Sequence, residues 1–259
     1  MSSDKPFSNR SAVYVAISVL SVLHANKVTA DDGSGTVWGI GIGAGTKEEL
    51  YTDFDDKNRV LPILFVDNKW LRLTGPNLDI KLGSLHNFNF SLRSKFALGD
   101  GYEAKDAEIL QGMSERKASI WVGPNISWQS DFVEVSLGGL FDAMDYSNGK
   151  QANLDISKTF RLSQRLRLEP SVGVVWQDAN YIDYYYGVEE DEVLLDRTYY
   201  EGEETVSTKV SINLSYGLSR NKSISLMTGI KTVAEEIENS PLVESDSASW
   251  ATLAFIYRF

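Results

Sequence analysis

The sequence predicts an all-β fold, a closed antiparallel transmembrane β-barrel of about twelve strands. Three observations lead to this prediction. Segments of about ten residues alternate between apolar and polar side chains, the length of a tilted membrane-spanning strand. Short connections fall on one side of the sheet and long ones on the other, and the last strand is apolar and ends on Phe259. Because side chains alternate across a pleated strand, such segments present one face to lipid and one to a polar lumen.

The amino-terminal residues 1–30 are predicted to be a secretory signal peptide. Lys5 and Arg10 precede an apolar run at residues 12–23, and small residues follow at 28–30. This is the order of a basic leader, an apolar segment and a cleavage site. The alternative is a single membrane anchor, but the run is shorter than the roughly 20 residues that a spanning helix needs. We therefore expect a mature barrel of residues 31–259.

Composition excludes several classes of function. Charged residues are 24% of the chain and the mean hydropathy is −0.22, values compatible with a barrel whose strands are half polar. There is no cysteine, which excludes disulfides and thiolate metal sites. The net charge of −11 makes nucleic acid an unfavourable partner. We expect no cofactor.

The first third of the chain gives the weakest strand pattern. Residues 37–44 alternate, with Trp38, Ile40 and Ile42 on the lipid face and glycines on the lumen face. Residues 60–66 and 70–73 form a predicted hairpin, and residues 78–82 return after a turn at 75–77. These segments are short, and Pro62 cannot donate a hydrogen bond to a neighbouring strand. If residues 60–82 pair poorly, a ten-stranded barrel is the alternative.

From His86 onward the alternation is regular and defines a polar face. Predicted strands in residues 86–98, 117–128, 133–142, 151–160, 165–177 and 206–218 each carry an apolar face opposite a polar one. The pattern continues at residues 224–230 after a tight turn at 220–222, and in residues 247–259 the face opposite the apolar one is mixed. The charged side chains on the polar faces are candidate lumen-lining residues: Arg93, Lys95, Lys117, Glu134, Asp155, Arg167, Glu169 and Lys209.

The connections set the orientation of the barrel. Those at 67–68, 83–85, 129–131, 161–164 and 219–222 are short and fall on one side, whereas those at 46–58, 99–115, 179–204 and 236–246 are long and fall on the other. Outer-membrane barrels have short periplasmic turns and longer external loops, so both termini are expected in the periplasm. The apolar end of the chain resembles the final strand of such barrels. In that resemblance Phe255, Tyr257 and Phe259 are the signal read by the barrel-assembly machinery.

Four short phrases resemble one family. Residues 58–62 read N-R-V-L-P, residues 185–188 read Y-Y-G-V, residues 240–243 read S-P-L-V, and the chain ends in I-Y-R-F. In this order they resemble the MipA/OmpV family of outer-membrane proteins. The resemblance implies a non-enzymatic barrel in the outer membrane, in contact with its lipid. It also implies a scaffold that bridges a periplasmic lytic transglycosylase and a murein synthase. Other members of the family are porin-like or adhesive.

No catalytic or metal-binding residue is expected. We expect the family phrases to be structural, with Pro62 and Pro241 fixing turns and the tyrosines at 184–186 capping the rim or folding into the mouth. His86 falls on a periplasmic turn without a nearby acidic residue in the sequence. The acidic segment 189–204 either binds cations through its carboxylates or is a solvated surface loop. Two functions stay open, a scaffold with a filled barrel and a narrow porin-like channel for small solutes.

Overall fold

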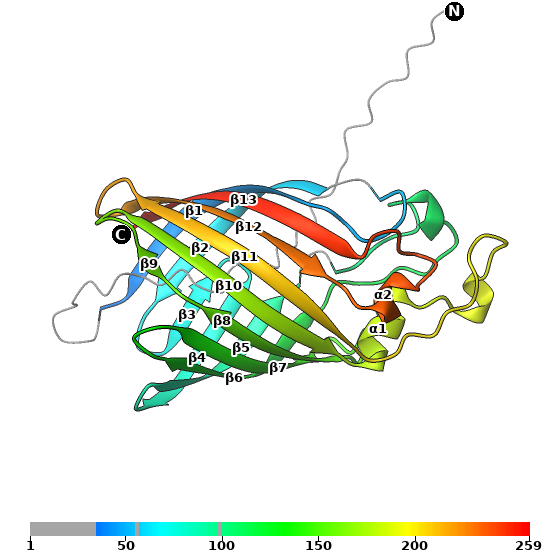
Figure 1. Ribbon diagram of the computed structural model, residues 1–259, viewed down its shortest axis with the longest axis horizontal. Helices are drawn as coiled ribbons and strands as arrows, with labels where there is room; N and C mark the ends of the chain where they lie inside the picture. The colour runs from blue at the N-terminus through cyan, green and yellow to red at the C-terminus, as the bar shows by residue number, and fades with distance from the viewer. Residues whose placement is uncertain (1–34, 55–56, 98–99) are drawn as a thin grey trace, which may run out of the picture.

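The protein forms one closed antiparallel barrel (Figure 1). The computed structural model describes residues 35–259 except 55–56 and 98–99, so the predicted signal peptide at 1–30 lies outside the described residues. The strands are β1 (Val37–Lys47), β2 (Lys57–Asp67), β3 (Leu71–Thr74), β4 (Asn77–Leu85), β5 (Phe88–Phe96), β6 (Ile120–Gln129), β7 (Glu134–Asp142), β8 (Lys150–Ser157), β9 (Phe160–Arg161), β10 (Leu166–Gln177), β11 (Thr205–Gly217), β12 (Lys222–Thr232) and β13 (Ser247–Arg258). The helices are α1 (Ala179–Tyr186) and α2 (Glu235–Glu238), with 3-10 turns η1 (Glu108–Leu110) and η2 (Glu190–Glu192).

The barrel has twelve strand positions, which confirms the predicted number. Each strand pairs with its neighbours in sequence, and β13 pairs with β1 to close the sheet. Segments β8 and β9 both pair with β10, so they form one strand position interrupted at residues 158–159. Closure gives the backbone N–H and C=O groups of β1 and β13 hydrogen-bonding partners, which a lipid environment cannot supply.

The alternation of faces is confirmed along the strands. Trp38 on β1 is 48% exposed to the outside of the barrel, and the glycines between the apolar residues of β1 face the lumen. On β13 the outward face carries Leu253, Phe255 and Tyr257, as predicted. Aromatic side chains cluster at the strand ends, with Phe88 opposite Trp128 at the end with short turns. This placement suits rings at a membrane interface.

A small apolar cluster lies inside the lumen on strands β2 and β13. Ile63 from β2 and Ile256 from β13 are buried together with Ala254. They lean over the glycines of β1, because a Cβ added at Gly43 would lie 3.2 Å from Ile63 Cδ1 and one at Gly41 would lie 3.1 Å from Ile256 Cγ1. The space that the glycines leave is therefore occupied by neighbouring side chains.

The two sides of the barrel differ in their connections, as predicted. Short turns join β2–β3, β4–β5, β6–β7, β9–β10 and β11–β12, whereas the long connections lie at the other end (Figure 1). One boundary prediction was wrong. Strand β4 continues to Leu85, and the predicted 83–85 turn lies instead at His86, which adopts a left-handed backbone conformation with φ of 53°.

Pro62 lies in the middle of β2, so its predicted role in a turn was wrong. Strand β3 is short and reaches only Phe65–Asp67 of β2. Gly75 N donates to Leu64 O on that side. Because backbone groups two residues apart in a strand point the same way, the nitrogen of Pro62 faces the side where β3 has ended. Proline is tolerated there since no hydrogen-bond donor is needed.

The pairing of β1 with β13, which we call the seam, predicts that two glycine substitutions differ sharply in their effect on stability. In Gly41→Ala the new Cβ would overlap the carbonyl oxygen of Phe255 on β13, so β1 and β13 must shift apart. We expect a loss of about 1–3 kcal/mol in the free energy of unfolding. Gly139→Ala on β7 is the control, because a Cβ there meets no atom within 4 Å. Thermal unfolding followed by heat-modifiable electrophoretic mobility measures both. Equal stability of the two variants would contradict the tight packing at the seam.

Candidate functional site: the loop plug

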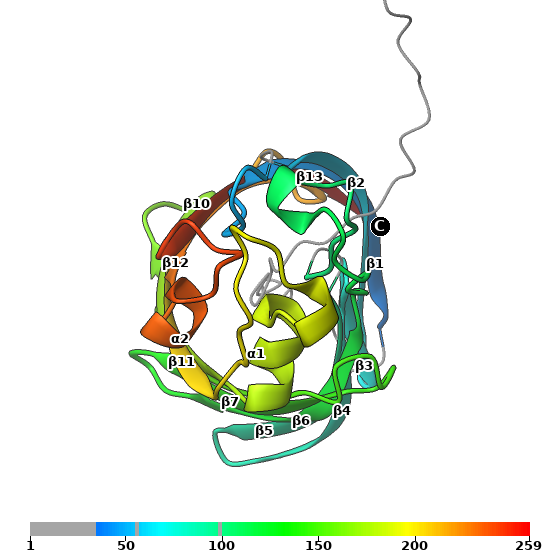
Figure 2. The same ribbon diagram turned by 90° about the vertical axis from the view of Figure 1, so that its right-hand side faces the viewer.

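The long connections fold together over and into one mouth of the barrel (Figure 2). We call the described residues of segments 48–54, 97–119, 143–149, 178–204 and 233–246 the plug. Their apolar side chains form one cluster that continues onto the upper barrel wall. It contains Leu50, Tyr51, Ala97, Tyr102, Ala107, Leu110, Met113, Trp121, Leu140, Tyr181, Ile182, Tyr185, Tyr186, Val188, Val233, Ile237, Leu242 and Ala248. The plug therefore has a hydrophobic core of its own.

Helix α1 is the centre of the plug. The Asp178 side chain caps it by accepting a hydrogen bond from Tyr181 N at 3.1 Å, and the same carboxylate accepts from Lys150 N at the end of β8. The helix buries Tyr181, Ile182, Tyr185 and Tyr186 on one side and ends at Gly187. The predicted alternative in which the tyrosines fold into the mouth applies to Tyr185 and Tyr186, whereas Tyr184 is half-buried.

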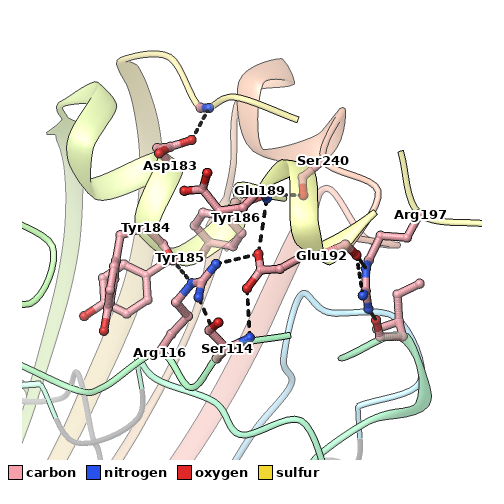
Figure 3. Close-up of polar contacts among 12 residues, drawn as sticks. Ser114, Arg116, Asp183, Tyr184, Tyr185, Tyr186, Glu189, Glu192, Arg197 and Ser240 are labelled. Carbon is pink, nitrogen blue, oxygen red and sulfur yellow. Dashed lines mark hydrogen bonds and ion pairs between the residues drawn. The ribbon is translucent and has the colours of Figure 1, made fainter. Parts of the chain in front are cut away.

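Three other loops bind the carboxyl end of α1 (Figure 3). The last carbonyl groups of a helix have no partner within the helix and must be satisfied elsewhere. Arg116 Nε donates to Tyr184 O at 2.8 Å, Tyr51 Oη donates to Tyr185 O at 3.0 Å, and Ser240 Oγ donates to Tyr186 O at 2.6 Å. These donors come from three different connections, so α1 joins them. The predicted turn at Pro241 is confirmed, because Val243 N donates to Ser240 O across it.

A buried ion pair joins the 97–119 and 178–204 loops. Arg116 Nη2 lies 2.8 Å from Glu192 Oε2, and both side chains are buried. Glu192 also accepts from the backbone N–H groups of Ser114 and Glu189 (Figure 3). Burial by itself would raise the pKa of the Glu192 carboxyl, but these hydrogen bonds and the Arg116 guanidinium outweigh it and hold that pKa below its ordinary value.

Arg197 fastens the acidic loop to the rest of the plug. Its side chain is 1% exposed. The guanidinium donates to the backbone carbonyl of Glu192 at 2.6 Å, to that of Gln111 at 3.0 Å, and to that of Ile109. The planar fork of an arginine can reach several carbonyls at once, whereas a lysine ammonium cannot match that geometry. Segment 189–204 is thus held by a side chain that the sequence pattern did not single out.

The phenols of the plug stay neutral. Burial raises the pKa of Tyr51, Tyr181 and Tyr185 well above the ordinary value for tyrosine. Their hydroxyl groups therefore act as hydrogen-bond donors throughout the physiological range. Tyr185 Oη, for example, donates to Lys117 O at 3.1 Å.

Five of the predicted lumen-lining residues lie on the wall in or beside ion pairs. Arg93 Nε is 2.7 Å from Asp79 Oδ1 on the neighbouring strand β4. Lys209 Nζ is 2.9 Å from Asp155 Oδ1, whose side chain crosses Gly173 of β10. Lys95 lines the same cavity as these pairs. Glu169 is buried and accepts from Thr159 Oγ1 at 2.6 Å.

The other three predicted residues differ in position. Glu134 and Arg167 are half-buried near the short-turn end, on β7 and β10. Lys117 is exposed and precedes β6, which begins only at Ile120. Its ammonium lies 5.5 Å from the ring centre of Tyr146, so it sits on the plug and not on the barrel wall. The polar alternation continues past the end of the strand, which is why the sequence placed Lys117 in the lumen.

The proposed assembly signal lies on the outer surface of the seam. Phe255 and Tyr257 are on the outward face of β13, and the ring of Phe259 stacks on Trp38 with centroids 4.0 Å apart. Recognition of these side chains by the barrel-assembly machinery stays a prediction.

Sequence reasoning missed the residues that hold the plug together. Trp121 was not assigned to either face, yet it is fully buried and its ring lies 5.4 Å from that of Tyr181. The sequence did contain a signal for this, because a residue between outward-facing Ile120 and Val122 on β6 must face the lumen. Arg116 and Glu192 are 76 residues apart, and nothing in the local pattern pairs them.

Within residues 35–259 outside the two gaps, no three His, Asp or Glu side chains are arranged to hold a metal ion. In the same part of the chain, no helix is both long and apolar enough to cross a membrane. Cation binding by residues 189–204 stays a prediction.

Comparison with known proteins identifies the family. Residues 40–259 match the family described as MltA-interacting protein MipA. The chain belongs to the MipA family. A 24 kDa outer membrane protein of Pasteurella multocida is 24% identical, over 88% of this chain and 91% of its own length. The MltA-interacting protein of Escherichia coli is 23% identical, over 85% of this chain and 89% of its own.

Solved barrels resemble this MipA-family chain only loosely. OmpT of Vibrio cholerae covers 88% of this chain and 99% of its own, with 8% identity and a TM-score of 0.39. The NanC porin covers 84% and 98%, with 8% identity and a TM-score of 0.41. Family membership, the names of the relatives and the closed barrel together make this protein an outer-membrane β-barrel.

The Arg116–Glu192 pair predicts an acid-sensitive plug. Because the folded-state pKa of Glu192 is lowered, its contribution to stability is present above the ordinary value of 4.5 and is lost as the pH falls through the lowered value. The protection factors of Ser114 N and Glu189 N, which compare their hydrogen–deuterium exchange with the intrinsic exchange rate at each pH, should therefore fall between about pH 5 and about pH 3. Glu192→Gln should show low protection factors at both pH values, since it leaves Arg116 buried without its carboxylate. Glu190→Gln, at an exposed site, is the control, and protection at Ser114 unaffected by Glu192→Gln would refute the role of the pair.

Proposed function

We propose that this protein is a non-conducting scaffold in the outer membrane whose short-turn end binds murein-synthesising and murein-hydrolysing enzymes. The observation that carries the proposal is the packed plug. Five connections share one hydrophobic core across the loop end, and Ile63, Ala254 and Ile256 form a second, small apolar cluster inside the lumen. A barrel built in this way is suited to hold a fixed shape and poorly suited to pass solutes.

The likeness to a relative named for its interaction with MltA supports a murein enzyme as the partner. The match covers 89% of that relative, so it includes the segments that form both the short-turn end and the loop end of the barrel. In an outer-membrane barrel the short turns face the periplasm, where murein lies. A periplasmic lytic transglycosylase and a murein synthase are the partners that this reading implies.

The short-turn end offers apolar contacts for such a partner. Trp70, Phe132 and Leu162 lie in three different turns and are all exposed. Large apolar side chains of this kind act as anchors when a partner supplies pockets for them. Their separation over three turns gives a broad surface, even though each turn is small.

A binding experiment tests the scaffold. The refolded barrel in detergent is immobilised, and retention of a purified periplasmic lytic transglycosylase is measured. We expect Phe132→Ser combined with Leu162→Ser to weaken retention about tenfold or more. Leu195→Ser, an exposed leucine in the plug at the opposite end, is the matched control and should leave retention unchanged. Retention that is absent in the native protein, or that both variants reduce equally, would rule out docking at this end.

A narrow channel for small solutes is the second candidate. The charged cavity in the lumen favours it, with Arg93 and Lys95 among its lining residues. Conductance in a planar bilayer separates the two functions. We expect no steady steps from the native barrel, and steps from a variant in which residues 179–203 are replaced by a short glycine-serine linker. Steady steps in the native protein that change in size or ion selectivity with Arg93→Ala would instead establish a channel.

A further inference from the structure

A cavity lies in the lumen next to α1. Its volume is about 220 Å³, and its lining comes from around the whole barrel and from the plug. Tyr181 and Tyr186 of α1 form part of its wall, and Lys231 of β12 and Lys95 of β5 contribute from separate strands. Ligand pockets for drug-sized molecules begin at about 300 Å³, so this cavity suits a smaller molecule.

Two of the five basic side chains in the cavity form no ion pair among the described residues, although the charge of Asp100 acts on both of them. Arg93 pairs with Asp79, Lys209 with Asp155, and Lys47 with Glu49. No carboxylate among the described residues lies within 4.0 Å of the ammonium of Lys95 or Lys231, although Asp100 is part of the same lining. Placing a positive charge inside a protein costs free energy unless an anion accompanies it.

Two glutamines in the same wall have unused hydrogen-bonding atoms. Gln151 on β8 is 9% exposed and Gln177 on β10 is 2% exposed, and the two residues are direct cross-strand partners. Gln151 Nε2 and Gln177 Oε1 have no partner in the part of the chain that the structure describes. Both residues line the cavity. A buried donor and a buried acceptor without partners are each unfavourable, and a ligand with hydroxyl groups can satisfy both once the two amide groups turn toward the cavity.

The cavity also has an apolar side. Leu140, Val175 and Trp250 contribute apolar surface next to the two tyrosines of α1. A ligand that combines one negative charge, hydroxyl groups and a compact carbon ring would match all three kinds of surface. A simple inorganic anion would leave the apolar side and the glutamine atoms without contacts.

We propose that this cavity binds a small ring-shaped hydroxy-carboxylate of the size and chemistry of a hexuronic acid. Its carboxylate lies between Lys95 and Lys231, and its hydroxyl groups bond to Gln151 and Gln177. Because Tyr181 and Tyr186 belong to α1, the bound molecule contacts both the wall and the plug and stabilises their association. This site is independent of docking at the short-turn end.

Ligand-dependent thermal stability tests the site. The probe is sodium D-glucuronate, added to the refolded full-length mature barrel in detergent. D-glucose is the uncharged comparison, and sodium chloride at the same ionic strength controls for salt. A ligand that binds only the folded state raises the unfolding midpoint by mass action. We expect glucuronate in excess to raise the midpoint by about 2 °C or more, and glucose and sodium chloride to leave it unchanged.

Variants of the two lysines assign the binding to this cavity. Lys95→Gln and Lys231→Gln should each abolish the glucuronate-dependent shift. Without ligand, each should be at least as stable as the native barrel, because an unpaired buried charge has been removed. Lys69→Gln, on an exposed turn at the far end of the barrel, should keep the native shift.

The proposal has clear contrary outcomes. It is overturned if glucuronate gives no shift, if glucose gives an equal shift, or if the Lys95 and Lys231 variants keep the native shift. A lower stability of both lysine variants without ligand would also overturn it, since the lysines would then have partners in the protein itself. If a variant does not refold, Gln177→Leu provides the same test, because it removes the free acceptor without touching a charge.

Discussion

The structure depends on one constraint, that no backbone hydrogen-bonding group is left without a partner where the chain meets lipid. Strands β1 and β13 meet this constraint by pairing with each other over Gly39–Lys47, which joins the two ends of the chain. The glycines of β1 allow the close approach, and the side chains of Ile63 and Ile256 fill the space above them. The closing strand β13 therefore also contributes Ala254 and Ile256 to a small apolar cluster in the lumen.

The plug meets the same requirement by a different route. Helix α1 is only eight residues long, so a large share of its backbone carbonyls lack partners within the helix. Arg116, Tyr51 and Ser240 supply the missing donors from three loops. Because each donor belongs to a different connection, satisfying the helix end also fixes the loops relative to one another. The loops over the mouth are thus held together by side chains that complete the hydrogen bonding of the helix.

Charge inside the barrel is arranged in pairs along the wall. Arg93 and Asp79 neutralise each other on the neighbouring strands β5 and β4. Lys209 on β11 and Asp155 on β8 do so across the strand between them, β10. Such pairs leave little field across the lumen, in contrast to the separated acidic and basic walls that favour ion passage. Lys95 and Lys231 are the exceptions among the basic residues of the cavity, because neither forms an ion pair with a described carboxylate.

The sequence by itself determined the barrel, the number of strand positions, the lipid and lumen faces and the side that carries the long loops. These features follow from the alternation of side chains with a period of two and from the lengths of the connections, and both can be read from neighbouring residues in the chain. It misjudged Pro62 and Lys117, because the length of β3 and the start of β6 depend on pairing with distant strands. Only the tertiary structure decided that the long loops pack together over the mouth. The contacts that hold them, such as Arg116 to Glu192, join residues far apart in the chain, and no local periodicity records which buried carbonyl or carboxylate a given side chain will reach.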